Sequence, residues 1–246
     1  MKALVLAGGR GKRLNERTEE VNKCMLRLHG KPLIQYSLDN ALAAGVEEIV
    51  VVVGYRAEDI INEFGISHRG TRIQYVIQAE RRGLVHAMEC ARPAIGGADF
   101  MLFLADEILV QPRHEEMLRQ FREQNLFVCC GVVRVADRAL IRKTYALIGD
   151  ERSQRIYRLV EKPRVPINDI MGTGNCIMRS GIYDYLERTP INPERGEKEL
   201  PDLIQCAIDE GREVHYFDIG DGYININTPD DIESVEARYQ TRLLSR

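Results

Sequence analysis

The 246-residue sequence has no uninterrupted apolar stretch near the roughly 20 residues that a membrane-spanning helix needs. Its start, MKALVLAGG, has too short an apolar part for a signal peptide and continues directly into a glycine-rich segment. The 34 basic and 37 acidic residues give a net charge of −3, which argues against a surface for nucleic acid. We therefore expect a cytoplasmic protein that binds neither a membrane nor nucleic acid; the sequence leaves its oligomeric state open, a homo-oligomer included.

The six cysteines lack the spacing of a metal or redox site. None of them forms a CxxC pair, and no histidines cluster beside them, so a zinc site is not expected. Cys129 and Cys130 are neighbours on a predicted strand and must face opposite sides of it. We expect all six to be small hydrophobic side chains in a reducing compartment.

Internal repeats and low-complexity linkers are also absent, which favours a single domain over residues 1–246. In the first half, predicted strands at 2–7, 48–54, 73–78, 100–105 and 127–135 alternate with predicted helices at 32–44, 57–64, 84–92 and 113–124. Such alternation predicts parallel βαβ units. The second half is less regular, with expected strands at 145–148, 156–160, 170–178 and 214–218 and helices at 182–187, 199–210 and from Pro229.

The most distinctive segment follows the first strand. Residues 2–7 are apolar enough to be buried on both faces, and the next six residues read Gly-Gly-Arg-Gly-Lys-Arg. Glycines let the backbone turn sharply and bring bare N–H groups close to a ligand. Arginine and lysine in the same loop suit a polyphosphate, because a guanidinium pairs with phosphate oxygens. The segment predicts a nucleoside triphosphate site.

Two common phosphate-binding motifs do not fit this segment. A P-loop would need glycine in place of Leu6 and serine or threonine in place of Arg13. The Rossmann fingerprint would need glycine in place of Leu14. The remaining pattern, LAGGRGKRL, resembles the opening of the sugar-phosphate nucleotidylyltransferases. The resemblance implies that the turn wraps a triphosphate and that Arg13 contacts its outer phosphates; the implied nucleotide-binding residues here are Leu6, Ala7, Gly8, Gly9, Gly11 and Arg13.

The resemblance also implies a fold and a reaction. The fold is α/β, a Rossmann-like (glycosyltransferase-A-like), predominantly parallel mixed sheet flanked by helices, with a small β-rich acceptor-binding part. The reaction moves a nucleotidyl group from an NTP to a sugar 1-phosphate, with Mg²⁺ assisting in-line attack on the α-phosphorus. Residues 1–135 would form the nucleotide-binding half, and residues 136–246 the acceptor-binding half.

Such a reaction brings two anions together, so it needs placed cations and a metal ion. Lys23 stands ten residues after Arg13, ahead of RLHGKPLI, where the family has a lysine that contacts phosphate. Its flanks here are Asn22 and Cys24, whereas many members have proline or serine before the lysine. Arg13 and Lys23 are therefore the expected catalytic cations.

Asp106 is the expected metal ligand and third catalytic residue. It follows the apolar strand FMLFLA, at the sheet edge where open α/β sheets bind ligands. A carboxylate there is a natural Mg²⁺ ligand, and the resembled family has its metal-binding aspartate at this place. The side chain of the following Glu107 should point to the other face.

A second metal ligand is expected in YININTPDDI, which resembles a family segment that often carries aspartate. Here Asn225 and Asn227 stand in that segment, and in extended backbone both point to the same side. The alternative is that they only prepare the start of the helix that Thr228 would cap. The two readings are balanced for Asn225, and a ligand role is favoured for Asn227.

Recognition of the base is expected at Gln78 and Gly83, which the resemblance places against the edge of a pyrimidine. An amide carries both a donor and an acceptor, so after a flip it could suit uracil, thymine or cytosine. His86, on the same predicted helix as Gly83, is expected to be a core or surface histidine rather than a catalytic one.

The acceptor would be held by Glu161, Lys162 and Asn175. The resemblance assigns the glutamate to sugar hydroxyls, the lysine to the sugar phosphate and the asparagine to a further sugar contact. A carboxylate beside a cation suits a polyol phosphate. Tyr145-Ala146 replaces the Tyr-Gly common in the family, which points to an unusual acceptor.

Three other functions remain as alternatives. One is a cytidylyltransferase for an alcohol phosphate or phosphonate, or a molybdopterin-type guanylyltransferase; Gln78 disfavours the purine and Glu161 favours a hydroxyl-rich acceptor. Another is a glycosyltransferase, which would want Asp-x-Asp where residues 106–108 read Asp-Glu-Ile. The last is an inactive regulatory homologue, which the retention of Arg13, Lys23 and Asp106 argues against.

Overall fold

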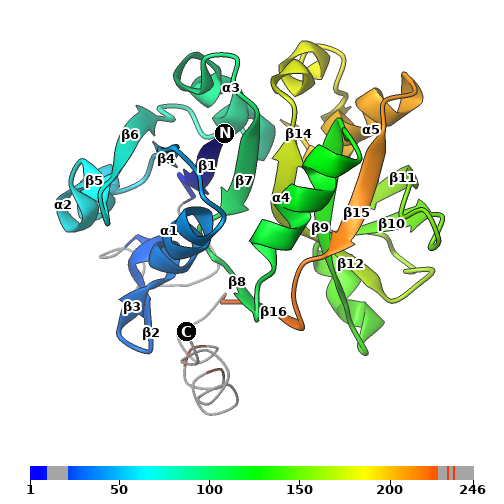
Figure 1. The fold of residues 1–246 in the computed structure, drawn as a ribbon, viewed down its shortest axis with the longest axis horizontal. Coiled ribbons are helices and arrows are strands. Elements are labelled where there is room, and N and C mark those ends of the chain that lie inside the picture. The colour runs from blue at the N-terminus through cyan, green and yellow to red at the C-terminus, as the bar shows by residue number, and fades with distance from the viewer. Residues whose placement is uncertain (10–21, 227–231, 233–234, 236–246) are drawn as a thin grey trace.

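A computed structural model describes residues 1–9, 22–226, 232 and 235 of the chain (Figure 1). In that part, ten strands form one main sheet, whose path runs β11-β10-β12-β7-β1-β4-β6-β5, with β9 and β15 joined at β12. Helices lie on both of its faces, as the two core clusters show. The predicted mixed sheet flanked by helices is confirmed.

The first half consists of parallel strands connected by helices. Its strands are β1 (Lys2–Ala7), β4 (Glu48–Val53), β6 (Thr71–Ile77) and β7 (Phe100–Leu104), and its helices are α1 (Leu33–Ala43), α2 (Ala57–Phe64) and α3 (Leu84–Ile95). β1 pairs in parallel with β4 and β7, and β4 pairs in parallel with β6. The alternation read from the sequence is therefore a set of βαβ units, as predicted.

Antiparallel strands enter the sheet in the second half. β12 (Ile170–Met178) runs antiparallel to β7 and to β9 (Val128–Arg134), and β15 (Val214–Asp218) lies parallel to β9. β10 (Tyr145–Gly149) pairs with both β12 and β11 (Ile156–Glu161). The helices of this half are α4 (His114–Glu123) and α5 (Leu200–Asp209). The two predicted halves thus share one sheet, through the pairing of β12 with β7.

Several short elements were not expected from the sequence. β8 (Glu107–Val110) pairs antiparallel with β16 (Gly222–Asn225) directly after Asp106. Two-residue strands form the pairs β2 (Arg27–Leu28) with β3 (Lys31–Pro32) and β13 (Ile191–Asn192) with β14 (Glu197–Lys198), and β5 (Ser67–His68) pairs with β6. The helix predicted at 182–187 is instead a 3₁₀ turn over Ser180–Tyr185. The helix predicted from Pro229 lies outside the described residues.

The core at the main sheet consists of two apolar layers, one on each face, and a smaller cluster lies around β8 and β16. Leu4, Val50 and Val52 pack with α3 and α5 on one face, and Val5, Val51 and Val53 pack with α1 and α4 on the other. Figure 1 shows α1 and α4 in front of the sheet. Because both faces are covered, the central strands are continuous apolar runs rather than alternating ones. Among the cysteines, four are buried and two are partly buried, and all six are free thiols.

Long apolar helices are missing from the described part of the chain. None of the helices there is long and apolar enough to cross a membrane.

Gly172 provides a test of the packing in β12. It lies opposite Tyr145, and a Cβ atom added at Gly172 would be 2.0 Å from the tyrosine ring. The ring is buried and its hydroxyl donates to the carbonyl of Thr173 at 3.0 Å, so it has little room to move. Gly172→Ala should lower the free energy of unfolding by about 1–3 kcal/mol in urea titrations. Gly9→Ala is the control, because nothing in the described part of the chain lies within 4 Å of the added atom; equal stability of the two variants would contradict the packing.

Candidate active site

A pocket of about 680 Å³ opens at the carboxyl ends of β1 and β7. Its volume is in the range of small-molecule sites, and its place is the usual ligand edge of an open α/β sheet. The lining residues are Leu6, Gly8, Gly9, Lys23, Cys24, Gln78, Ala79, Arg81, Gly83, Leu84, Ala87, Leu104, Asp106 and Glu197.

The pocket brings together residues predicted from separate parts of the sequence. Lys23, Asp106, Gln78 and Gly83 meet there with Leu6, Gly8 and Gly9 of the glycine-rich segment. Ala7 is buried at the end of β1. Gly11, Arg13, Asn227 and the side chain of Asn225 lie outside what the structure describes. Their predicted roles stay predictions.

The centre of the pocket is an ion pair between Lys23 and Asp106. The Lys23 Nζ atom lies 2.6 Å from the Asp106 Oδ2 atom, and the two side chains are 11% and 31% exposed. The lysine ammonium group and the aspartate carboxylate therefore lie side by side in the pocket. The lysine can bind phosphate oxygens, and the aspartate can supply an oxygen ligand to a metal ion. Mg²⁺ is commonly bound by one or two carboxylates together with substrate phosphates, and this donor fits that chemistry. Among the described residues, no three His, Cys, Asp or Glu side chains form a closed metal cage.

Asn22 fixes the position of Lys23, a role that the sequence did not reveal. Asn22 is fully buried and caps the 3₁₀ turn Lys23–Met25. Its Oδ1 atom accepts from the Cys24 N–H at 2.9 Å, and its Nδ2 atom donates to the Tyr55 carbonyl at 2.6 Å. Its own N–H donates to Asp59 at 3.2 Å. The signal in the sequence was the unusual asparagine before the lysine. The structure gives a reason for it, because Asn22 anchors the turn of Lys23 to the segment that follows β4.

Glu107 holds the other side of the site. Its Oε2 atom accepts from the Gly174 N–H at 2.8 Å and from the Asn175 Nδ2 atom at 3.1 Å. Its Oε1 atom accepts from the Tyr223 hydroxyl at 2.9 Å. Burial of the carboxyl group is the main cause that raises the pKa of Glu107 to about 8, and the nearby charge of Asp106 adds to the rise. The carboxyl group therefore ties β8 to β12 and β16 immediately beside the metal-ligand candidate.

The structure places Asn175 in the interior rather than in the pocket. Only 4% of the residue is exposed, and its Oδ1 atom lies 2.9 Å from the Nε2 atom of His114. Because its Nδ2 atom donates to Glu107, both ends of the amide are used within the protein. The structure thus does not bring Asn175 together with the predicted acceptor residues; it supports Glu107 instead.

Glu161 and Lys162 lie further along the same sheet edge. Glu161 stands opposite Tyr145, which stands opposite Gly172 of β12, and β12 lies beside β7. Three strand spacings, about 14 Å, therefore separate Glu161 from β7, the strand that Asp106 follows. The Glu161 Oε1 atom is 2.8 Å from the Lys162 Nζ atom. Burial raises the pKa of Glu161, against the hydrogen bond and charge of Lys162. Glu161 and Lys162, called the outer pair below, do not line the pocket. They lie beyond it along the same edge of the sheet.

Arg195 joins this pair and was missed from the sequence. Its Nη1 atom lies 3.5 Å from Glu161 and 2.7 Å from Glu199. Nothing distinguishes a single loop arginine in a sequence, since its partners come from distant segments. We call Glu161, Lys162 and Arg195 the outer site. In it, two cations lie beside one partly buried carboxylate.

Gln78 closes the inner end of the pocket. It is 6% exposed, and its Nε2 atom donates to the Gly83 carbonyl at 3.0 Å. A Cβ atom on Gly8 would be 2.8 Å from the Gln78 Oε1 atom, so a larger residue there would push the amide out of its position. Gly83 has a φ of +92° and faces Glu197 closely, so glycine is required there.

Replacement of Asn175 distinguishes a structural role of this residue from a direct contact with the acceptor. Asn175→Ala would leave Glu107 and His114 each without this partner, so we expect the free energy of unfolding in urea to fall by about 1–3 kcal/mol. The Michaelis constants for both substrates should change little. Gln120→Ala, which removes a partly buried amide bonded to Gln154, is the control and should cost less stability. Unchanged stability of Asn175→Ala with a raised constant for the acceptor would instead support the acceptor contact.

Comparison with known proteins agrees with this arrangement. The nucleotidyl transferase family matches residues 2–242. The UTP–glucose-1-phosphate uridylyltransferase AglF of Haloferax volcanii is 33% identical over 242 residues, which cover 98% of this chain and 97% of the relative. A glucose-1-phosphate thymidylyltransferase of Streptomyces griseus is 32% identical over 216 residues, which cover 87% of this chain and 59% of the relative.

Solved structures show the same fold. A UDP-glucose pyrophosphorylase complexed with UDP-glucose has a TM-score of 0.87 to this chain at 22% identity, covering 98% of this chain and 99% of that one. The family match spans nearly the whole chain, and the resemblance inferred from LAGGRGKRL is confirmed. The chain belongs to the nucleotidyl transferase family.

Proposed function

We propose that this protein transfers a nucleotidyl group from a pyrimidine NTP to a sugar 1-phosphate, giving an NDP-sugar and pyrophosphate. The observation that carries the proposal is the Lys23–Asp106 pair inside a pocket that Gly8 and Gly9 also line. The relatives' names support it, since they couple UTP or a thymidylyl group to glucose 1-phosphate.

The chemistry follows from the charges in the pocket. A phosphate oxygen of the acceptor attacks the α-phosphorus of the NTP, and the bond to the β-phosphate oxygen breaks, so its electron pair leaves with pyrophosphate. Lys23 offsets the negative charge of the approaching phosphates and holds them in line. Asp106 would hold Mg²⁺, with Asn227 and Asn225 as the further candidates, and the ion would neutralise charge on the phosphate oxygens. Arg13 is proposed to bind the departing pyrophosphate.

The acceptor is proposed to lie between the pocket and the outer pair. Glu161 can accept hydrogen bonds from sugar hydroxyls, and Lys162 and Arg195 can donate to the acceptor's phosphate. Their mutual ion pairs hold the three charged groups together at one place, with the Glu161 side chain only 15% exposed. The outer site is thus shaped for a polyol that also carries an anion.

The direct test is a pyrophosphate-release screen. Each common NTP is combined with a set of sugar 1-phosphates in the presence of Mg²⁺, and with an alcohol phosphate and a phosphonate as alternative acceptors. Turnover with a pyrimidine NTP and a sugar 1-phosphate is the expected result. Turnover restricted to the non-sugar acceptors would replace the proposal by the alternative.

Removal of either central charge should abolish most of the activity. We expect Asp106→Ala and Lys23→Met each to lower kcat by about 10²–10³, the usual loss when a group that stabilises developing charge is removed. Pyrophosphate release with saturating Mg²⁺ measures this.

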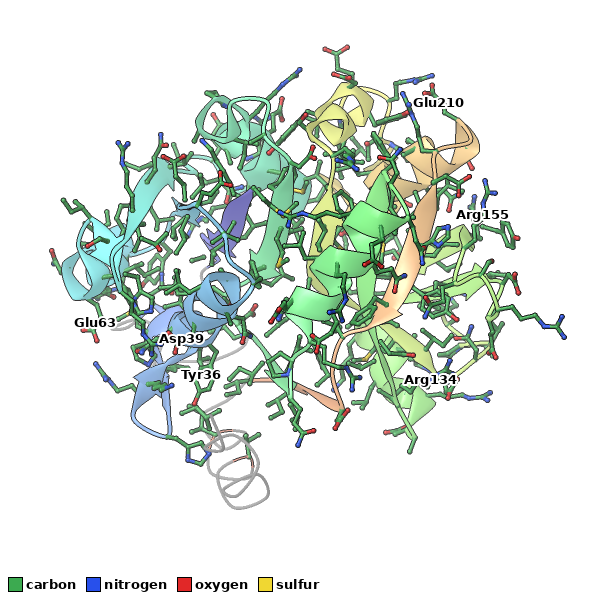
Figure 2. The ribbon with its side chains drawn as sticks, in the orientation of Figure 1. Tyr36, Asp39, Glu63, Arg134, Arg155 and Glu210 are labelled. Atoms are coloured by element: carbon green, nitrogen blue, oxygen red, sulfur yellow. The ribbon has the colours of Figure 1, made fainter. Side chains whose placement is uncertain are left out.

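Asp39→Ala is a matched control for these variants. Asp39 is also ion-paired, with Lys31, His68 and Arg69, but it stands on α1 away from the pocket lining (Figure 2). Its kcat should stay within about twofold of the original, as for surface charges in general. If Asp106→Ala retained normal turnover, its metal role would be wrong.

Changes in the outer pair should affect only the acceptor. Glu161→Gln and Lys162→Met should each raise the Michaelis constant for the sugar 1-phosphate about tenfold or more, since each removes a hydrogen bond to a charged group. The constant for the NTP should not change. Arg158→Met, an exposed change on the same strand, is the control. A rise in the constant for the NTP instead would place the pair at the nucleotide.

A further inference from the structure

The amide of Gln78 is held from one end. Within the described part of the chain, its partners are the Gly83 carbonyl and the His86 Nδ1 atom, each 3.0 Å from Nε2. Both contacts use the nitrogen end. The Oε1 end lies beside Gly8, and both Gly8 and Gln78 line the pocket.

The Gly83 carbonyl favours one orientation of the amide, and His86 is the second partner that holds it there. A carbonyl oxygen can only accept, so it needs the NH₂ end of Gln78. A flipped amide would place Oε1 about 3 Å from this carbonyl, two acceptors facing each other with one of them buried, which costs the full desolvation of an unmade hydrogen bond. The orientation with Nε2 toward Gly83 is therefore the favourable one.

That orientation also fixes the proton on His86. Because Gln78 donates to it, the Nδ1 atom of His86 must accept, and in the neutral ring the proton then sits on Nε2. The Cys90 sulfur, 3.7 Å from Nε2, can accept this proton. The Arg82 guanidinium also lies 2.8 Å from Nε2, but arginine is only a donor, so this contact competes with the tautomer. Arg82 is exposed, and its Nε atom also pairs with Glu80 at 3.2 Å, so the guanidinium keeps a partner when its Nη2 contact with His86 is lost.

We infer that His86 is a specificity-determining residue that positions Gln78, so that only the acceptor Oε1 faces the base and pyrimidines with an N3–H group are selected. The inference rests on the proposed function. Uracil and thymine carry a proton on N3, which can donate to Oε1. Cytosine has a lone pair on N3, which would oppose Oε1. The amide flip that would admit all three bases is thereby blocked.

The selection should be large, because it depends on a buried polar atom. A site that is built to hydrogen-bond one group rejects an analogue without it far more strongly than an apolar pocket rejects a shape difference. In the unaltered protein, kcat/KM should therefore favour UTP or dTTP over CTP by at least about 100-fold.

The test compares variants of His86 by this ratio. His86→Leu keeps the bulk but removes the acceptor for Nε2, so the preference for UTP over CTP should fall by about tenfold, the effect of roughly 1.4 kcal/mol. His86→Asn can place its Oδ1 atom where Nδ1 was and should restore the preference to within about threefold. Arg82→Ala, which removes the competing contact, should leave the preference unchanged.

Binding provides a readout that does not need turnover. The dissociation constants of UDP and CDP, measured by calorimetry with each variant, should show the same order. A purely structural role of His86 would lower the melting temperature and weaken both nucleotides equally, without moving their ratio.

The outcomes separate this inference from the proposed function. An unaltered protein that uses or binds UTP and CTP equally, or a His86→Leu variant with an unchanged ratio, overturns the inference while the transferase activity stands. If no NTP is turned over but UDP binds more tightly than CDP and His86→Leu abolishes the difference, the proposed function fails and the base selection holds. An effect of Arg82→Ala as large as that of His86→Leu would overturn the assigned tautomer and with it the inference.

Discussion

The site depends on one contact, the 2.6 Å ion pair between Lys23 and Asp106. These residues come from segments 83 positions apart, one after the glycine-rich turn and the other after β7. A lysine side chain that is only 11% exposed would be costly without a partner, and the carboxylate supplies one. The pair thus keeps two opposite charges inside one pocket, which is what a polyanionic substrate and a metal ion both require. Neither charge could be kept there as favourably alone.

Each member of the pair is supported by a buried polar residue next to it in the sequence. Asn22 anchors the turn of Lys23 to the chain after β4, and Glu107 anchors the turn of Asp106 to β12 and β16. Because these supports come from different strands, the two charges are held relative to the whole sheet rather than to a local loop. Such preorganisation lets a site stabilise charge without rearranging first.

The sequence was sufficient to predict the central strands, because apolar runs such as EIVVVV can only be buried on both faces. It also placed Asp106, Gln78 and the start of the glycine-rich turn at one edge, since parallel strands end there together, whereas Lys23 was predicted from the family resemblance. The sequence could not show that Asn175 lies in the interior. All nine residues of β12 are buried, so the strand has no exposed polar face that would indicate which side chains point at the pocket. The pairing of β8 with β16 and the roles of Asn22 and His86 depend on partners distant in sequence, which local patterns do not contain.

Gly8 links the two ends of the pocket. A Cβ atom there would meet the Gln78 amide, and one on Gly54 would lie 2.8 Å from the Gly8 carbonyl, so the ends of β1, β4 and β6 converge with no side chain between them. Gln78, which we propose to face the base, therefore packs directly on Gly8, at the start of the turn that we propose to face the phosphates. A base that displaced Gln78 would also displace this turn, and the α-phosphorus would no longer lie in line with Lys23 and Asp106. A wrong base would then lower the rate of transfer as well as the affinity. The reason is that the transition state forms only when the attacking oxygen and the α-phosphorus are correctly positioned.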